Sequence, residues 1–137
     1  DLSGATLTNV DLSLVDWRGA KVTTTTTLSA SQRRVWALVN GGAAGQTLAA
    51  IDLSWTNLQG IILAGADLHQ SNFTPALLRQ SDLRNVNLQA ADLSYADLTN
   101  ANLQGADLTG ANLTGAILTG AILDGANLTQ VVGLSPK

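Results

Sequence analysis

The chain of 137 residues is long enough for one domain or one short array of repeats. Its net charge of −3 is too small for binding nucleic acid by electrostatics alone, and it contains no cysteine, which excludes disulfides, thiolate metal sites and thiol nucleophiles. Because Asp1 stands where a start methionine would, we expect a fragment or a processed form of a longer chain.

Residues 1–24 form a first block in which a large apolar residue recurs at every fifth position. These recurring residues, here called centres, are Leu2, Leu7, Leu12, Trp17 and Val22. The positions two before the later centres hold Ala5, Val10, Val15 and Ala20. Trp17 is large for a position that otherwise holds an aliphatic residue. We therefore expect this block to form a distorted or open-ended coil.

Residues 25–45 interrupt the repeat and predict a short amphipathic helix at about 30–40. Ser29 and Gln32 have the spacing of a capping box, and two glycines at 41–42 can end the helix. The apolar face of this helix consists of Val35, Trp36, Leu38 and Val39. Because a solenoid must cover its ends, we expect the helix to be a cap or lid, with a partner-binding helix as the alternative.

Residues 46–130 repeat every five positions without a gap, and 16 of the 17 centres are leucine. The centres run from Leu48 to Leu128, with Phe73 as the exception. The residue two before the centre is usually small, and the residue directly before it is Asp or Asn in 12 of the 17 units. This array is the main structural signal of the chain, because repeats at a fixed period indicate a repeat architecture.

A period of five residues fits neither an α-helix nor a continuous strand, whose periods are about 3.6 and 2. Within one unit, the small residue and the centre are two positions apart, so both point to one side of a short extended segment. An odd period returns the next centre to that side only if the chain bends in every unit. Each unit therefore predicts one β-bridge and one corner, and the chain winds into an all-β solenoid with leucine and alanine inside.

The three units at 96–110 are Ala-Asp-Leu-Thr-Asn, Ala-Asn-Leu-Gln-Gly and Ala-Asp-Leu-Thr-Gly. This pattern resembles the pentapeptide repeat family, strongly over 46–130 and more weakly over 1–22. The resemblance implies a right-handed quadrilateral β-helix with four units, or about 20 residues, in each coil, carrying one short α-helical insert. The segment at 33–40 also resembles helical inserts of cyanobacterial members.

A coil of this length makes a prediction about charge, because like charges stacked on successive coils would repel one another. Within 46–130, no Asp is followed by another Asp exactly one coil later. The two alternating files of residues are Asp52, Asn72, Asp92, Asn112 and Asp67, Asn87, Asp107, Asn127. Their alternation supports the four-sided coil.

The tail at 131–137 is expected to cap the C-terminal end of the column. Its apolar residues are Val131, Val132 and Leu134. Ile117 and Ile122 occupy outward positions that elsewhere hold Asp or Asn. They predict either a homodimer contact through the C-terminal end or packing under the tail, and the sequence does not favour one of these over the other.

Few residues are suited to catalysis. There is one histidine, His69, and no glutamate, and the repeat accounts for nine of the ten Asp, which directly precede a centre. We expect His69, Arg79 and Arg84 to lie on three faces of one coil and to form ordinary surface pairs with Asp82 or Asp97, with a binding role as the alternative. No stretch of 18 apolar residues is present. We therefore expect no catalytic residue, no enzymatic activity, no cofactor, no metal and no membrane insertion.

One surface feature departs from the repeat. Trp55, Pro75 and Tyr95 are separated by one coil length each and end their units, so they should stack on one corner of three successive coils. A row of outward aromatic side chains is typical of protein interfaces. We interpret this corner as a candidate partner-binding surface. The alternatives are an ordinary surface ladder or a Trp55 covered by the helix.

The sequence thus favours a non-enzymatic structural, scaffold or protein-interaction module whose partner is another protein. The alternative, implied by the family resemblance, is a mimic of duplex DNA that inhibits or protects DNA gyrase. Within 46–130, seven Asp and two Arg give a net charge of −5, and Asn dilutes the Asp files, so the field is weak for such a mimic. We do not expect direct nucleic-acid binding. The resemblance is compatible with the cytoplasm, the periplasm or the thylakoid lumen.

Overall fold

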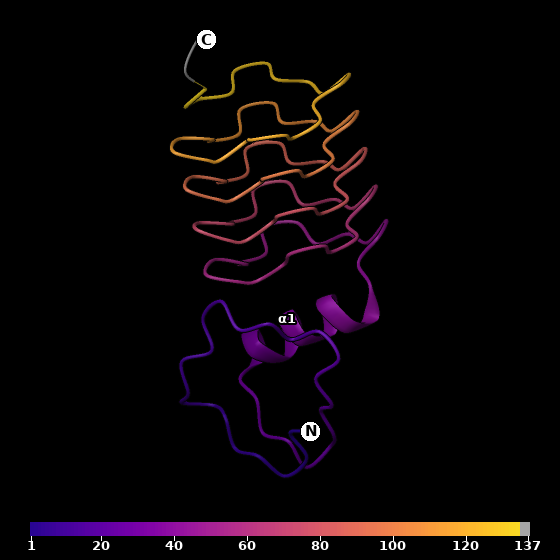
Figure 1. Cartoon of the computed structure of the whole chain (residues 1–137), viewed down its shortest axis with the longest axis vertical. Coiled ribbons are helices and arrows are strands. Elements are labelled where there is room, and N and C mark those ends of the chain that lie inside the picture. The colour runs from indigo at the N-terminus through magenta and orange to yellow at the C-terminus, as the bar shows by residue number, and fades with distance from the viewer. Residues whose placement is uncertain (135–137) are drawn as a thin grey trace.

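The computed structural model describes residues 1–134 and is a right-handed quadrilateral β-helix with one short helix (Figure 1). Its β structure consists of single-residue parallel bridges between neighbouring coils. In the array, each bridge joins residues 20 positions apart, as in Asp52 with Asn72, and Asn72 with Asp92. The predicted coil of four five-residue units is therefore confirmed.

The corners explain why Asp or Asn directly precedes so many centres. Where that position holds Asp or Asn, the side chain accepts a hydrogen bond from the backbone amide two residues later, as Asp92 Oδ1 does from the Ser94 amide at 2.9 Å. The centre's carbonyl accepts from the amide three residues on, and Leu58 does so from Ile61 at 3.1 Å. The repeated Asp or Asn therefore stabilises the bend that the five-residue period requires.

Leucine and alanine fill the interior of the column, as the pattern predicted. The centres from Leu53 to Leu113 are buried, and the ring of Phe73 is completely enclosed. On the outside, the alternation of Asp and Asn produces hydrogen bonds between coils. Asn87 Nδ2 donates to Asp67 Oδ1 at 2.9 Å. In the same way, Asn112 Nδ2 donates to Asp92 Oδ1 at 3.2 Å. Alternation thus replaces repulsion between coils by attraction.

The helix α1 (Ala30–Gly41) lies between the first coil and the array (Figure 1). Ser29 and Gln32 form the expected capping box, and Val35 and Leu38 are buried. Side chains of α1 bond to backbone carbonyls of the first coil. Three such bonds run from Gln32 Nε2 to Leu7 O (2.9 Å), from Trp36 Nε1 to Ala20 O (2.7 Å) and from Asn40 Nδ2 to Trp17 O (2.9 Å). The helix therefore covers the first coil. The Ala20 carbonyl holds a position that in the array accepts from the next coil, and here Trp36 takes that role.

The threonine tract at 23–27 belongs to the β structure, although its sequence does not follow the repeat. Thr27 forms a parallel bridge with Thr6, and the Thr26 hydroxyl donates to Leu2 O at 2.8 Å. The bridge between Thr6 and Thr27 spans one position more than those of the array, so this coil contains one extra residue. Trp17 is buried in the same core, which accommodates its bulk beneath α1.

The described part of the tail covers the C-terminal end only in part. Val131 packs against the core, whereas Val132 pairs with Asn112 and continues the coil with its side chain exposed. Gly133 stands where the next centre would be and has no side chain to cover the core. Ile117 and Ile122 are exposed, so the described part of the tail does not cover them. The rest of the predicted tail, residues 135–137, lies outside the described residues.

Candidate functional site

The structure brings the three predicted site residues together on one corner of the column. Trp55 and Pro75 stack on successive coils, because the residues two positions after them, Asn57 and Leu77, form a bridge. Tyr95 stacks on the coil after that. Trp55 is 56% exposed and Tyr95 65% exposed, while Pro75 is partly buried. The helix therefore does not cover Trp55.

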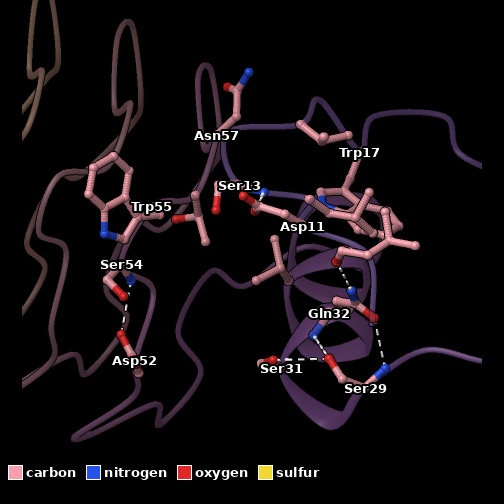
Figure 2. Close-up of a pocket in the computed structure, with 15 residues that line it drawn as sticks. Asp11, Ser13, Trp17, Ser29, Ser31, Gln32, Asp52, Ser54, Trp55 and Asn57 are labelled. Carbon is pink, nitrogen blue, oxygen red and sulfur yellow. Dashed lines mark hydrogen bonds between the residues drawn. The ribbon is translucent and has the colours of Figure 1, made fainter. Parts of the chain in front are cut away.

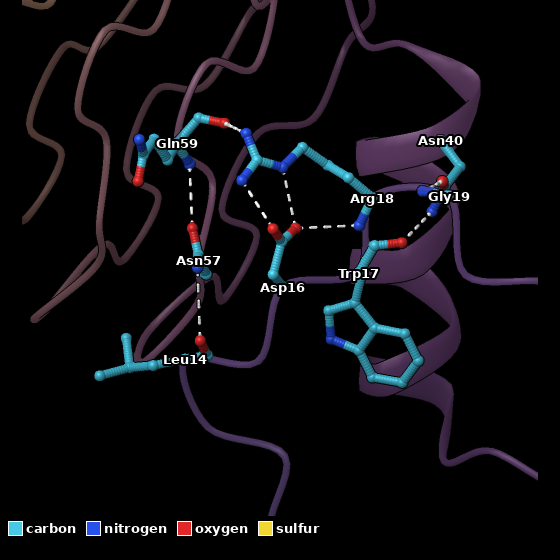
Figure 3. Close-up of polar contacts among 8 residues, drawn as sticks. All are labelled: Leu14, Asp16, Trp17, Arg18, Gly19, Asn40, Asn57 and Gln59. Atoms are coloured by element: carbon cyan, nitrogen blue, oxygen red, sulfur yellow. Dashed lines mark hydrogen bonds and ion pairs between the residues drawn. The ribbon is translucent and has the colours of Figure 1, made fainter.

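Leu14 extends this row on the other side of Trp55. Its amide donates to Trp55 O at 2.8 Å, and Asn57 Nδ2 reaches Leu14 O at 3.4 Å (Figure 3). We call Leu14, Trp55, Pro75 and Tyr95 the aromatic corner. Sequence reasoning missed Leu14 because it lies about two coil lengths before Trp55, in the block whose repeat has a different phase. The only available signal was its position, two after a centre.

The ring of Tyr95 lies over the backbone of the next coil. A Cβ atom added to Gly115 would come within 2.7 Å of Tyr95 Cδ1 and Cε1. Gly115 therefore allows the ring to lie flat along the column. The corner continues as an apolar surface from Leu14 to this glycine.

Negative charge lies beside the aromatic corner. Asp52 and Asp92 stand on the face that leads into it. Hydrogen bonds from the Ser94 side chain hold the pKa of Asp92 below its usual range, although burial opposes them. On the following face, Arg79 pairs with Asp97, and Leu77 is half-buried. The apolar row of the corner therefore has carboxylates along one side.

The other residues that the sequence singled out are engaged in local pairs. His69 Nδ1 lies 2.8 Å from Asp67 Oδ1, and Arg84 Nη2 lies 2.6 Å from Asp82 Oδ2. His69 and Arg84 therefore form surface pairs, whereas Arg79 pairs with an Asp97 side chain that is only 7% exposed. They do not converge on one site.

A cavity of about 320 Å³ lies next to Trp55, between the first coil and the array (Figure 2). Asp11 and Val10 line it on the first coil, Asp52 lines it on the array, and Val35 of α1 contributes to its base. Sequence reasoning did not predict this cavity. It depends on how the first block and the array meet, and no local pattern encodes that arrangement.

Arg18 fastens the first coil to the array close to this cavity (Figure 3). Its Nη1 donates to Gln59 O at 3.3 Å, and its Nη2 lies 2.6 Å from Asp16 Oδ2. The hydrogen bond from Arg18 lowers the pKa of Asp16 to about 2. The pair therefore remains charged at neutral pH.

Residues 1–134 contain no group of three or more histidines and aspartates arranged to hold a metal ion. No helix in the described part of the chain has the length and apolar character needed to cross a membrane.

Solved structures of cyanobacterial proteins are similar to this chain. Rfr23 from Cyanothece 51142, a pentapeptide repeat protein, is 38% identical with a TM-score of 0.61, and the match covers 63% of this chain and 59% of that chain. The pentapeptide repeat protein alr5209 from Nostoc PCC 7120 is 37% identical with a TM-score of 0.51, covering 66% of this chain and 70% of that chain.

A more distant likeness is to QnrB1, a plasmid-mediated fluoroquinolone resistance protein. It is 19% identical with a TM-score of 0.57, and the match covers 61% of this chain and 42% of that chain, so it shows the fold alone. None of the curated proteins matches the sequence.

The family model described as pentapeptide repeats matches residues 51–89 and 91–130 with eight copies of the repeat. Proteins of this kind are generally non-enzymatic. Because the matched residues make up more than half of the chain, and the coil geometry agrees with the repeat, the chain belongs to the pentapeptide repeat family.

Proposed function

We propose that the protein is a non-enzymatic interaction module that binds another protein along the aromatic corner. The observation that carries this proposal is the exposure of Trp55 and Tyr95 on one edge of the column, with Leu14 and Pro75 in the same row. Tryptophan and tyrosine are enriched among the residues that dominate binding energy at protein interfaces. An exposed row of them is therefore better suited to docking than to solvation.

The backbone conformation of this corner is the one found at other corners of the column. Trp55 and Tyr95 adopt left-handed conformations with φ of 56° and 57°. The equivalent position of other units holds either glycine, as at Gly110 with φ of 68°, or another non-glycine residue, as at Gln70 with φ of 58°. The support for binding therefore comes from the exposure of the two aromatic side chains and not from backbone strain.

The rigid column favours binding for a second reason. Bridges at every coil and a filled core hold the corner residues in place before a partner arrives. Less conformational entropy is then lost on association than with a mobile loop. The carboxylates of Asp52 and Asp92 beside the row favour a partner with an apolar patch and basic residues at its edge.

The test compares the native chain with the variant Trp55→Ala/Tyr95→Ala. Each is immobilised, proteins retained from a cyanobacterial extract are identified, and the affinity of the retained protein is then measured with purified components. Ile62→Ala is the matched control, because Ile62 is also an exposed apolar residue but lies on another face. We expect the double variant to weaken binding by about 30-fold or more and the control to change it less than two-fold. Equal affinity of the native chain and the double variant would contradict the proposal, provided that both unfold at the same temperature.

The C-terminal end supports a separate proposal, that two copies of the chain associate through it. Ile117, Ile122 and Val132 are exposed there, and the leucines of the last coil are only partly covered by the described residues. Light scattering of the native chain should show a dimer at about 100 µM. Ile117→Asp/Ile122→Asp should make the chain monomeric, because two carboxylates would be buried in the interface. A monomeric native chain would rule this contact out.

The alternative function, mimicry of duplex DNA toward gyrase, has weaker support. Several carboxylates on the column are neutralised, including those of Asp82 and Asp97 by neighbouring arginines. The remaining Asp alternate with Asn on successive coils. We expect no inhibition of gyrase in a supercoiling assay at micromolar protein, and inhibition at that concentration would restore this function as the leading candidate.

A further inference from the structure

The helix α1 interrupts the stacking of coils and leaves a gap in one face. In the array, stacked residues are 20 positions apart, but Leu14 bonds directly to Trp55, which is 41 positions later. The first coil therefore meets the array at this corner without a coil between them. On the face before this corner, the first coil and the array separate around the cavity of about 320 Å³ (Figure 2). We call this opening, between residues 10–13 and 52–54, the wedge groove.

Backbone groups on both sides of the wedge groove lack partners. In the regular array, the Asn72 amide donates to Ile51 O at 2.9 Å and its carbonyl accepts from the Leu53 amide at 2.8 Å. Asp52 holds the same position one coil earlier, yet neither its amide nor its carbonyl is hydrogen-bonded within residues 1–134. The Leu12 amide on the opposite side is also unpaired in that range. On the first coil, the Val10 carbonyl accepts from Gln32 Nε2 at 3.1 Å, so that edge is open at Leu12 only. The unpaired groups form two partly open strand edges, which an extended peptide can join.

The two sides of the groove each carry a carboxylate. Asp11 and Asp52 both directly precede a centre, so they belong to the same outward file. Asp11 Oδ1 accepts from the Ser13 amide at 2.9 Å, and Asp52 Oδ1 accepts from the Ser54 amide at 3.0 Å. Hydrogen bonding by Ser13 keeps the pKa of Asp11 below its usual range. Neither carboxylate is paired with a basic side chain of the described residues, so both attract a cation.

The array shows what fits between two such carboxylates. On successive coils of this file, an Asn lies between Asp52 and Asp92, and Asn72 Nδ2 donates to Asp52 Oδ1 at 3.3 Å. A strand in the wedge groove would place one side chain at the corresponding position between Asp11 and Asp52. A donor with positive charge suits that position best, because both neighbours are ionised. Val35 and Trp17 provide an apolar base for the next, inward-pointing side chain.

We propose that the wedge groove binds an extended segment of a partner protein that completes the missing coil face and places a lysine or arginine between Asp11 and Asp52. The segment lies parallel to its neighbours, like every bridge in the column. Its backbone pairs with Asp52 and Leu12, and an apolar residue directly after the basic one points toward the base. This proposal rests on the interaction function described above, because the groove adjoins Trp55 of the aromatic corner, and it specifies the chemistry of the partner.

The test uses two fluorescein-labelled peptides, Thr-Ala-Lys-Leu-Thr and its counterpart with Asp in place of Lys, each ending before the position where Leu14 meets Trp55. Fluorescence anisotropy at low ionic strength should show binding of the basic peptide and at least ten-fold weaker binding of the acidic one. Asp11→Asn/Asp52→Asn should weaken the basic peptide about five-fold, since two partly exposed ion pairs are lost and Asn preserves the local turns. Asp67→Asn/Asp107→Asn removes the same charge from another face and should change the affinity less than two-fold.

Amide exchange measured by NMR locates the peptide. On binding, the amides of Leu12 and Asp52 should exchange at least ten-fold more slowly, because they become hydrogen-bonded. No binding at 1 mM peptide, equal binding of both peptides, or protection confined to another face would overturn the proposal.

The experiments distinguish failure of the groove proposal from failure of the corner proposal. If a protein partner depends on Tyr95 but no peptide enters the groove, the groove proposal is wrong and the interaction function stands. If the basic peptide binds as expected while Trp55→Ala/Tyr95→Ala leaves the affinity for the protein partner unchanged, the groove stands and the corner proposal is wrong.

Discussion

The contact between Tyr95 and Gly115 gives a sharp test of the geometry of the aromatic corner. In Gly115→Ala, the new Cβ would lie 2.7 Å from Tyr95 Cδ1 and Cε1, well inside the ordinary carbon contact distance of about 3.5–4.0 Å. The ring is 65% exposed, so it can rotate away from the column. The substitution therefore moves Tyr95 off the coil that supports it without disturbing the core.

The expected cost separates into two parts. Alanine at a φ near 69° costs about 1–2 kcal/mol, and the loss of freedom in the unfolded chain offsets about 0.4–1 kcal/mol of this. Gly110→Ala carries the same backbone cost, with φ of 68° and no atom within 4 Å of the added Cβ. Displacing the Tyr95 ring adds a cost typical of a lost contact between neighbouring strands, about 0.2–1 kcal/mol. Gly115→Ala should therefore destabilise the chain more than Gly110→Ala by about that amount.

Guanidinium unfolding followed by circular dichroism measures these differences. The additional cost of Gly115→Ala should disappear in a Tyr95→Ala background, to within about 0.3–0.5 kcal/mol, whereas the cost of Gly110→Ala should not change there. Equal costs for the two glycine substitutions in the native background would show that the Tyr95 ring does not lie on Gly115. An additional cost that persists without Tyr95 would have the same meaning.

Three further predictions concern the core, the charge files and acid stability. Phe73→Ala should lower the free energy of unfolding by about 3–5 kcal/mol in chemical denaturation, because the ring is fully buried, and Phe73→Leu should cost much less. Asn72→Asp should lower the unfolding midpoint at pH 7 by replacing a hydrogen bond to Asp52 with repulsion, and the loss should diminish below about pH 4 as carboxylates protonate. Because Arg18 lowers the pKa of Asp16 to about 2, the pair stabilises the chain above about pH 4 and this contribution is lost as the pH falls toward 2. Arg18→Gln should therefore reduce the dependence of stability on pH in that window, and an unchanged dependence would contradict the role of the pair.

The array was predictable because its units share one local residue pattern. The small residue and the leucine specify the inward side, and the Asp or Asn specifies the bend through its bond to the backbone two residues later, as Asp92 shows with Ser94. Once the coil length follows from the repeat, the positions of Trp55, Pro75 and Tyr95 follow from arithmetic. The capping box at Ser29 is equally local, and the helix begins directly after it.

The C-terminal end was predicted only in part, because apolar composition does not determine direction. Val131 packs against the core, but Val132 falls at the outward position directly before a centre, and the centre itself is Gly133. Ile117 occupies the same position in its unit as Val132, and its outward direction was predicted from that position. A prediction for the tail needs the phase of the repeat to be carried into it.

The wedge groove could not be predicted, because it arises from the difference in length between a helix and an extended segment of the same number of residues. Twelve residues in α1 span about 18 Å, whereas twelve extended residues would cover about 40 Å. The helix therefore crosses the end of the column instead of winding around it, and the faces that it bypasses receive no backbone. At the Leu14 corner, the first coil closes this gap by contacting the array directly, while at Asp11 it does not. Which face closes depends on contacts between distant segments, such as Arg18 with Gln59, and these appear only when the first coil and the array are placed together.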